Sequence, residues 1–130
     1  MSVITVAAAV IVNAQKQLLV VRKKNTACFM QVGGKLEVGE LPEHAMAREI
    51  EEEIGSPVEI KSFLGTYMTD TANEPDCQLK SYVFHVELKA EPHIHAEIEE
   101  MKWVDLNDQC TLLAPLTRQV VMPWCLENLV

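Results

Sequence analysis

The sequence has no long hydrophobic run and few basic residues. Its longest apolar stretch, Val6–Val12, is far shorter than the roughly 20 residues that a membrane-spanning helix needs, and no basic segment precedes it as in a signal peptide. Eleven Lys and Arg stand against nineteen Asp and Glu, a net charge of −8, which is the wrong sign for gripping a nucleic-acid backbone. We therefore expect a cytoplasmic protein that binds neither a membrane nor a nucleic-acid duplex.

Cysteine, glycine and proline are also sparse. The four cysteines, Cys28, Cys77, Cys110 and Cys125, form no C-x-x-C pair and have no His at a zinc-like offset. This spacing argues against a zinc site or a disulfide framework and predicts mostly buried thiols. Five Gly and six Pro leave no linker or low-complexity segment, while 48% of the 130 residues are hydrophobic, enough for one core. We expect a single domain over residues 1–130.

Hydrophobic patterning predicts an α/β fold in which a mixed β-sheet packs between helices. A helix is expected over Glu43–Ile54, opened by Pro42 and closed by Gly55, and a second over Leu116–Leu129, kinked or interrupted at Pro123. The first two strands are joined by a short turn and are expected to be neighbours. The predicted strands are Val3–Val12, Gln17–Arg22, Phe29–Val32, Val58–Thr69, Leu79–Lys89 and Met101–Val104.

The acidic charge is concentrated in two segments. Residues 40–53 hold six Glu and one Arg, and residues 91–100 hold four Glu with no Lys or Arg, so the rest of the chain is nearly neutral. On a helix, Glu49, Glu52 and Glu53 fall on one face, where their like charges repel one another. Carboxylate oxygens grouped in this way suit hard divalent cations such as Mg²⁺ or Mn²⁺.

A glycine-rich segment just before this helix strengthens the metal interpretation. An E-x-x-E-E run alone is typical of a solvated helix face. Here, however, Gly33, Gly34 and Gly39 allow a tight loop whose backbone can approach an ion or a phosphate closely. Because this loop leads into the same helix, the sequence brings carboxylates and an exposed backbone together.

These residues together resemble the Nudix box. Gly34, five residues, Glu40, seven residues, and then Arg48-Glu-Ile-Glu-Glu-Glu-Ile-Gly55 match the pattern G-x5-E-x7-R-E-U-x-E-E-x-G-U at every fixed position. The final apolar position departs from the pattern as Ser56. The box covers residues 34–56, and the order of strands on both sides of it is also similar to a Nudix domain.

The resemblance implies an α/β/α sandwich that hydrolyses a nucleoside diphosphate linked to another group, with Mg²⁺ or Mn²⁺ as cofactor. It implies metal ligands at the Gly34 carbonyl, Glu49, Glu52 and Glu53, of which Glu49 or Glu53 also serves as the base or lies beside it. Arg48 would orient a carboxylate such as Glu40 or Glu49 through a bidentate contact. Each of these positions is taken from the motif.

A further carboxylate is expected from a later loop, with Glu97 as the first choice and Glu100 as the second. The alternative is that these are solubilising loop charges. His93 and His95 could reach a phosphate or a metal, although exposed loop histidines more often do neither.

Cations for a phosphate group are expected from Arg22, at a position that resembles one from which family members reach phosphate, and from Lys35. Gly33 and Gly34 complete the predicted substrate-binding set. Lys23 and Lys24 are interpreted as ordinary surface charge. Leu41, which precedes the helix where the family often has Thr or Ser, cannot cap the helix through its side chain.

By elimination and by size, the chain is most similar to MutT-like (d)NTP pyrophosphohydrolases, which release a nucleoside monophosphate and pyrophosphate. The window at residues 71–74 lacks the markers of ADP-ribose and dinucleoside polyphosphate hydrolases, and the segment 112–115 lacks the amide expected of guanine-reading members. Hydrolysis of those other nucleotide derivatives, a non-catalytic nucleotide sensor and an unrelated acidic interaction protein remain alternatives. The small-molecule partner is a nucleotide, and a homodimer is possible.

Overall fold

The structure is a computed structural model that describes residues 2–129. A four-stranded mixed sheet has the order β3-β1-β5-β4, in which β1 runs parallel to β5 and the other neighbours are antiparallel. A separate antiparallel pair joins β2 and β6. The strands are β1 (Ser2–Val10), β2 (Gln17–Lys23), β3 (Val32–Lys35), β4 (Val58–Asp70), β5 (Cys77–Leu88) and β6 (Ile98–Asp105).

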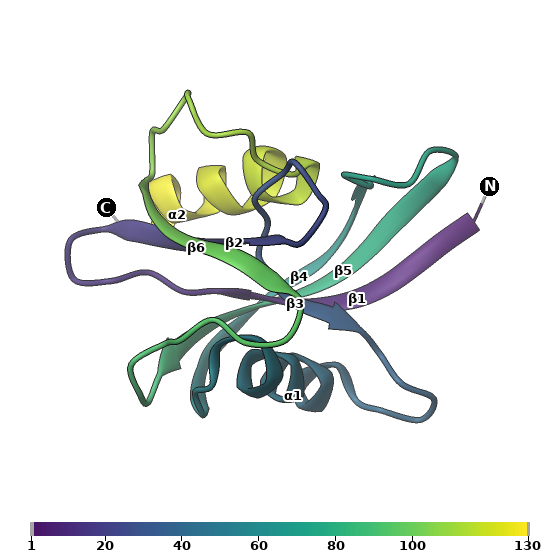
Figure 1. Ribbon diagram of the computed structural model, residues 1–130, viewed down its shortest axis with the longest axis horizontal. Coiled ribbons are helices and arrows are strands. Elements are labelled where there is room, and N and C mark those ends of the chain that lie inside the picture. Colours follow the sequence, from purple (N-terminus) through teal and green to yellow (C-terminus); the bar gives the residue numbers. More distant parts are fainter. Residues whose placement is uncertain (1, 130) are drawn as a thin grey trace.

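Two helical layers enclose the strands. Helix α1 (Pro42–Ile54) lies on one side, while a π-helical segment η1 (Thr117–Val121) and helix α2 (Met122–Asn128) lie on the other, which gives the expected α/β/α sandwich (Figure 1). Within residues 2–129, no helix is long and apolar enough to cross a membrane.

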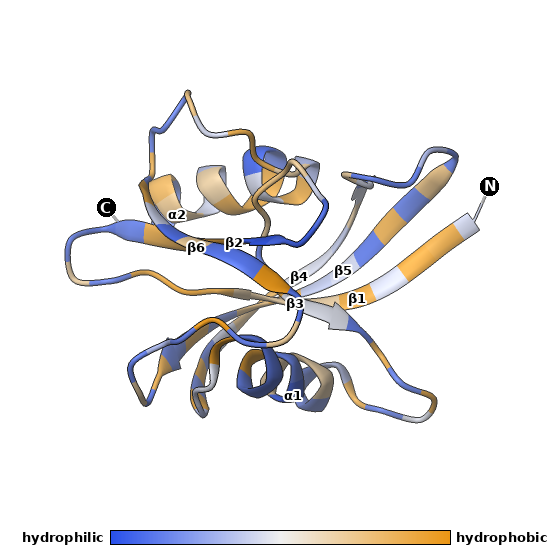
Figure 2. Ribbon diagram, viewed as in Figure 1, coloured by the Kyte–Doolittle hydropathy of each residue, from blue (hydrophilic) through white to orange (hydrophobic). Residues whose placement is uncertain are grey.

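The core is divided into two halves by the strands. Ala7 and Ala9 of β1 contribute to the half that faces α1, whereas Ala8 and Val10 contribute to the half that faces α2, because successive strand residues point to opposite faces. Both faces are covered, so β1 needs apolar residues on each side, and it is coloured mostly hydrophobic in Figure 2. The helices need only one apolar face and carry both kinds of residue.

Helix α1 follows its sequence signals closely. Pro42 occupies its first turn and Gly55 caps its C-terminus with φ +71°, a left-handed conformation that favours glycine. Leu41 is the N-cap and makes no side-chain capping hydrogen bond, as expected. The buried residues Ala45, Met46, Ile50 and Ile54 anchor the helix on the sheet, and this packing brings Glu49 and Glu53 against the backbone of β3.

Several predictions of secondary structure are corrected. The first two predicted strands touch through an isolated bridge, Val12↔Leu18, but β2 pairs with β6 while β1 pairs with β3 and β5. The third strand is shifted from Phe29–Val32 to Val32–Lys35, so Gly33 and Gly34 belong to a strand. They do so because they hydrogen-bond along β1, a partner distant in sequence.

The C-terminal helix is interrupted by a π-helical segment just before Pro123, which is one of the two expected outcomes. Proline cannot donate a backbone hydrogen bond and its ring crowds the carbonyl one turn earlier. Pro123 lies in the first turn of α2, and the N–H of Met122 donates to the carbonyl of Thr117 in the π-helical segment before it. The wider π turn accommodates the ring without ending the helical rod.

The prediction of mostly buried cysteines is wrong. All four are free thiols, but only Cys125 is buried, while Cys28 and Cys77 are partly exposed and Cys110 is exposed. Cys125 packs between α2 and the sheet, where burial raises the pKa of its thiol to about 12. The other three lie in or beside loops and strand ends, which the spacing of cysteines in the sequence does not reveal.

Candidate active site

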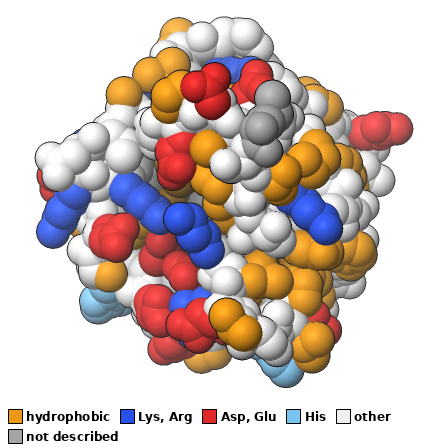
Figure 3. All heavy atoms as spheres, turned by 90° about the vertical axis from the view of Figure 1, so that its right-hand side faces the viewer, with side chains coloured by type: hydrophobic (Ala, Val, Ile, Leu, Met, Phe, Trp, Pro, Cys, Tyr) orange, Lys and Arg blue, Asp and Glu red, His pale blue; other side chains and the backbone are white. Residues whose placement is uncertain are grey.

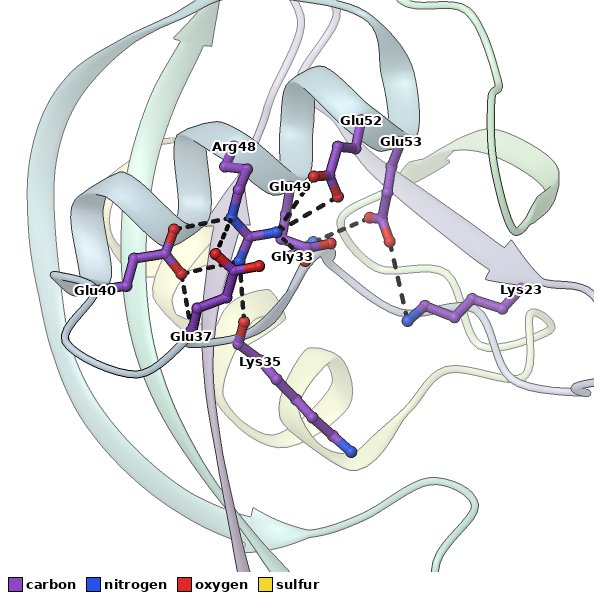
Figure 4. A network of polar contacts seen from close by, with 9 residues as sticks. All are labelled: Lys23, Gly33, Lys35, Glu37, Glu40, Arg48, Glu49, Glu52 and Glu53. Carbon is purple, nitrogen blue, oxygen red and sulfur yellow. Dashed lines mark hydrogen bonds and ion pairs between the residues drawn. The ribbon is translucent and has the colours of Figure 1, made fainter.

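Arg48 organises the acidic cluster on α1 (Figure 4). Its Nε donates to Glu40 Oε2 at 2.8 Å and its Nη2 donates to Glu40 Oε1 at 2.9 Å, a bidentate contact. Nη1 donates to Glu49 Oε1 at 3.0 Å, and Nη2 also donates to the carbonyl of Lys35 at 3.2 Å. Arg48 therefore connects Glu40 in the loop before α1, the adjacent Glu49 and the end of β3 in one unit.

The pKa values in this unit reflect the pairing. The Arg48 guanidinium lowers the pKa of the Glu40 carboxyl to about 2, and Glu40 in turn raises the pKa of Arg48 above its usual value. At neutral pH both groups stay charged. Glu40, just before α1, is thus the main partner of Arg48, which makes longer contacts with Glu49 and Glu52 through Nη1.

Glu53 is a buried carboxylate whose negative charge is only partly balanced by its neighbours. The residue is 5% exposed, and burial raises the pKa of its carboxyl to about 7. Its Oε1 accepts a hydrogen bond from the N–H of Gly33 at 3.3 Å, and its Oε2 lies 3.9 Å from Nζ of Lys23. A carboxylate in this setting favours a nearby positive charge.

Glu49 lies against the backbone of β3. Burial raises the pKa of its carboxyl even though Arg48 opposes the shift. A Cβ placed on Gly34 would lie 2.5 Å from the carboxyl carbon of Glu49, so only a glycine leaves room for this carboxylate. At the neighbouring position, a Cβ on Gly33 would lie 2.1 Å from the carbonyl oxygen of Ala7. Position 33 therefore requires glycine because the backbone of β1 is too close for a side chain.

The carboxylates open into a cavity of about 620 Å³. Its lining includes Glu49, Glu52, Glu53 and Glu97, here called the acidic wall, together with Lys23, and many of the other lining residues are apolar. In Figure 3, acidic side chains gather beside Lys and Arg side chains, with hydrophobic side chains alongside. The apolar and loop residues of the lining include Ile4, Val6, Met30, Leu79, Leu116, Asp70, Thr71 and Asn73. A lining with both charged and apolar side chains suits a ligand that has a charged part and an apolar part.

The two candidate late carboxylates are in different places. Glu97 lines the cavity, whereas Glu100 pairs with Arg22 on the β2–β6 ribbon, where Arg22 Nη2 donates to Glu100 Oε1 at 2.7 Å. Arg22 Nη1 also donates to the carbonyl of Thr26 at 2.8 Å. Arg22 is not among the residues that line the cavity, so the structure does not support the prediction that it contacts substrate.

The loop that carries Glu97 is attached to the end of α1. The N–H groups of His93 and His95 donate to the carbonyls of Ile54 and Glu53, each at 2.9 Å. The imidazole of His95 packs on Gly55, where an added Cβ would lie 3.0 Å from Nε2. These histidines therefore hold the loop in place through their backbone, and neither lines the cavity.

Lys23 is the residue that sequence reasoning missed. The sequence suggests ordinary surface charge for Lys23, yet this residue lines the cavity beside Glu53, while its neighbour Arg22 pairs with Glu100. The register of β2 against β6 shifts between these two residues, so strand alternation alone does not predict the position of Lys23. Lys35 lines the cavity as expected, but its side chain extends away from the carboxylates in Figure 4.

The donor set at this wall fits a hard divalent cation. It consists of carboxylate oxygens beside the exposed backbone of Gly34, with room that a Cβ would fill and a buried charge at Glu53 that is only partly compensated. Within residues 2–129, no three acidic, His or Cys side chains are yet gathered as a closed ligand set, because Glu49 is turned to Arg48 and Glu53 to Gly33.

Comparison with known proteins identifies the fold and this signature. The sequence pattern of the NUDIX domain matches residues 2–125, nearly the whole chain, and the matched segment contains every residue of the acidic wall. The chain belongs to the NUDIX domain family. Arg48 and the glutamates Glu49, Glu52 and Glu53 of α1 all lie within the matched segment.

Two curated relatives of the chain carry different names. A protein named ADP-ribose pyrophosphatase from Methanocaldococcus jannaschii is 33% identical over 102 residues, 75% of this chain and 60% of that protein. A MutT-like protein from Streptomyces ambofaciens is 38% identical over 64 residues, 49% of this chain and 42% of that protein. The chain therefore spans less than two thirds of the length of these curated relatives.

Solved structures support the NUDIX fold along the whole chain. A MutT NUDIX hydrolase from Burkholderia pseudomallei superposes with a TM-score of 0.78, at 24% identity, over 100% of both chains. At this identity the likeness concerns the fold alone.

Replacing Gly34 by Ala tests the close approach of the Glu49 carboxylate to the backbone of β3. The φ of Gly34 is outside the left-handed range, so Ala is allowed by the backbone and its methyl group acts by displacing the Glu49 carboxylate. We expect kcat/KM to fall about 10-fold while Tm changes little.

Gly39→Ala is the reciprocal control. Nothing lies within 4 Å of a Cβ at Gly39, but its φ is +76°, so Ala should lower Tm and leave activity nearly unchanged. If Gly34→Ala instead kept full activity, the position assigned to Glu49 in the site would be wrong.

Proposed function

We propose that the protein is a divalent-metal-dependent NUDIX pyrophosphohydrolase that cleaves the diphosphate of a nucleoside diphosphate linked to another group. The observation that carries the proposal is the wall formed by Glu49, Glu52, Glu53 and Glu97 beside the glycine backbone of β3. All three glutamates of the α1 signature are intact, whereas a sensor without catalytic activity has no need of them.

Mg²⁺ or Mn²⁺ would be held by Glu49, Glu52, Glu53 and Glu97 with the backbone carbonyl of Gly34. When bound, the metal supplies charge neutralisation at the phosphate oxygens and lowers the pKa of water. Glu53 and Glu49 are the groups positioned to accept the proton of an attacking water, since burial raises the pKa of each carboxyl toward the range useful at neutral pH.

The other residues of the wall position these groups. Arg48 holds Glu49 through one nitrogen while Glu40 fixes the guanidinium, so the carboxylate is presented in one orientation. Lys23 and Lys35 line the cavity and supply positive charge for the phosphates of the substrate.

A nucleoside triphosphate is the substrate class that we favour, with a nucleoside monophosphate and pyrophosphate as products. The cavity volume of about 620 Å³ lies in the usual range for small-molecule sites. Apolar residues of the cavity lining, such as Ile4, Val6 and Leu79, offer a surface for a base. An ADP-ribose-type substrate is the second candidate, favoured by the name of the archaeal relative that is 33% identical.

The test is a substrate panel assayed with and without Mg²⁺. Purified protein is incubated with the common NTPs and dNTPs, ADP-ribose, UDP-sugars and dinucleoside polyphosphates, and the products are separated by ion-exchange chromatography. We expect metal-dependent turnover, fastest with an NTP or dNTP. Tight nucleotide binding without any turnover would instead support the sensor, and neither binding nor turnover would support an interaction protein.

A homodimer is also proposed, and β4 is the strand through which it would form. This strand has 13 residues, lies at the edge of the four-stranded sheet and exposes Ile60, Phe63 and Met68. Light scattering of the purified protein tests it, and a monomer at all concentrations would contradict it.

A further inference from the structure

Lys23 brings an ammonium group to a buried carboxylate inside the cavity. Its Nζ lies 3.9 Å from Oε2 of Glu53, and the side chains are 33% and 6% exposed, respectively. Figure 4 shows Lys23 reaching from β2 toward Glu53 on α1. The distance exceeds that of a charge-assisted hydrogen bond, so the contact compensates the carboxylate without binding it tightly.

The local backbone aims Lys23 at this position. The register of β2 against β6 shifts between Arg22 and Lys23, and such bulges commonly re-aim a side chain beside a site. The carbonyl of Lys23 accepts a hydrogen bond from Thr26 Oγ1 at 2.8 Å, and the next N–H, that of Lys24, donates to the carbonyl of Glu97 at 2.8 Å. The backbone of Lys23 is therefore fixed, while its ammonium sits on a flexible four-carbon stem.

We propose that Lys23 is a positioning residue that competes with the divalent cation for Glu53 in the free protein and moves its ammonium to a phosphate when substrate binds. The inference rests on the proposed function for the identity of the metal and the phosphate. A metal ion and an ammonium beside the same carboxylate repel each other, so Lys23 weakens metal binding until an anion draws the ammonium away.

Metal and substrate would then bind cooperatively. If a phosphate releases Lys23 from Glu53, substrate raises the affinity for metal, and by linkage metal raises the affinity for substrate by the same factor. In the free protein Lys23 would partly balance the charge of Glu53, and the complete site would assemble only in the ternary complex.

A metal titration of the substrate-free protein tests the proposal directly. Mn²⁺ binding to the metal-free protein is measured by calorimetry for wild type, Lys23→Met and Lys24→Met. Lys24 is the matched control, because it is the adjacent, exposed lysine and does not line the cavity. We expect Lys23→Met to bind Mn²⁺ about 3- to 10-fold more tightly than wild type, and Lys24→Met to stay within about twofold. Unchanged or weaker binding by Lys23→Met would overturn the proposal, since a purely structural lysine cannot improve metal affinity when removed.

Two further arms keep the outcome decisive. Lys23→Arg retains the charge and should bind Mn²⁺ nearly as wild type does, while Lys23→Gln repeats the neutral substitution in case Lys23→Met unfolds. With saturating α,β-methylene-ATP, the gain in Mn²⁺ affinity should be larger in wild type than in either neutral variant, and an equal gain would contradict the coupling. The titration with metal alone measures the effect of Lys23 on Mn²⁺ affinity even if no substrate in the panel is hydrolysed. Failure of this inference and failure of the proposed function are therefore distinguishable.

Discussion

Glu53→Gln is expected to lower kcat about 1,000-fold at saturating Mg²⁺. The amide keeps the size of the side chain but can neither bind a cation as a carboxylate does nor accept a proton from water. The variant should remain folded, because Gln removes a charge that burial disfavours at Glu53. Steady-state kinetics with the best substrate of the panel and thermal melts of the metal-free protein measure the two effects separately.

Glu51→Gln provides the matched control for this variant. Glu51 lies on the same helix and is exposed, so the substitution removes the same formal charge outside the cavity lining. Its kcat should stay within about twofold of wild type. Mg²⁺ should raise Tm in wild type and Glu51→Gln but much less in Glu53→Gln. A Glu53→Gln enzyme that retained a tenth or more of wild-type kcat would remove Glu53 from the chemistry.

Arg48→Lys is expected to have the second largest effect, lowering kcat/KM about 30-fold and Tm by a few degrees. A single ammonium cannot reproduce the bidentate contact with Glu40 and also reach Glu49 and the carbonyl of Lys35. The carboxylate of Glu49 then loses its fixed orientation. Kinetics and calorimetric melts at several pH values are the measurements.

The pH dependence of the Arg48 variant has a definite sign. Because Arg48 holds the pKa of Glu40 at about 2, the pair stabilises the fold fully above the ordinary carboxyl value of 4.5 and loses that contribution as the pH falls toward 2. The gap in stability between wild type and Arg48→Lys should therefore narrow over that interval. A gap that is constant with pH would assign the loss to packing.

Arg118→Lys separates stability from catalysis. Arg118 donates to the carbonyls of Asp108 and Thr111 and does not line the cavity, so its replacement should lower Tm with little change in kcat/KM. If Arg48→Lys behaved in the same way, Arg48 would be a structural residue alone.

Helix α1 could be read almost completely from the sequence. Pro42, the spacing of Ile50 and Ile54 and the left-handed cap at Gly55 are local signals, and they fixed its limits within one residue. Helical geometry alone places Glu49, Glu52 and Glu53 on one face of α1. The grouping of these carboxylates could therefore be predicted from the sequence, although the rest of the cavity could not.

The parts that depend on distant partners were not predictable. Gly33 and Gly34 look like a loop in sequence, but pairing with β1 makes them part of a strand and the nearby carboxylate of Glu49 explains the second glycine. The inward position of Lys23 depends on a register shift against β6, which begins 75 residues later in the chain. Neither the pairing of β3 with β1 nor the position of Lys23 can be predicted from local secondary-structure propensity.

The attachment of the 91–97 loop to α1 limits how this protein can diversify. The backbone N–H groups of His93 and His95 donate to two carbonyls at the end of α1 that would otherwise lack partners. These hydrogen bonds connect the loop that carries Glu97 to the helix that carries Glu53. An insertion between β5 and β6 would free those carbonyls and move Glu97 without touching any carboxylate. The β4–β5 connection at 71–76 also borders the cavity but has no such tie to α1 among its backbone contacts. Insertions that change the choice of nucleotide should therefore be tolerated at 71–76 and costly at 91–97.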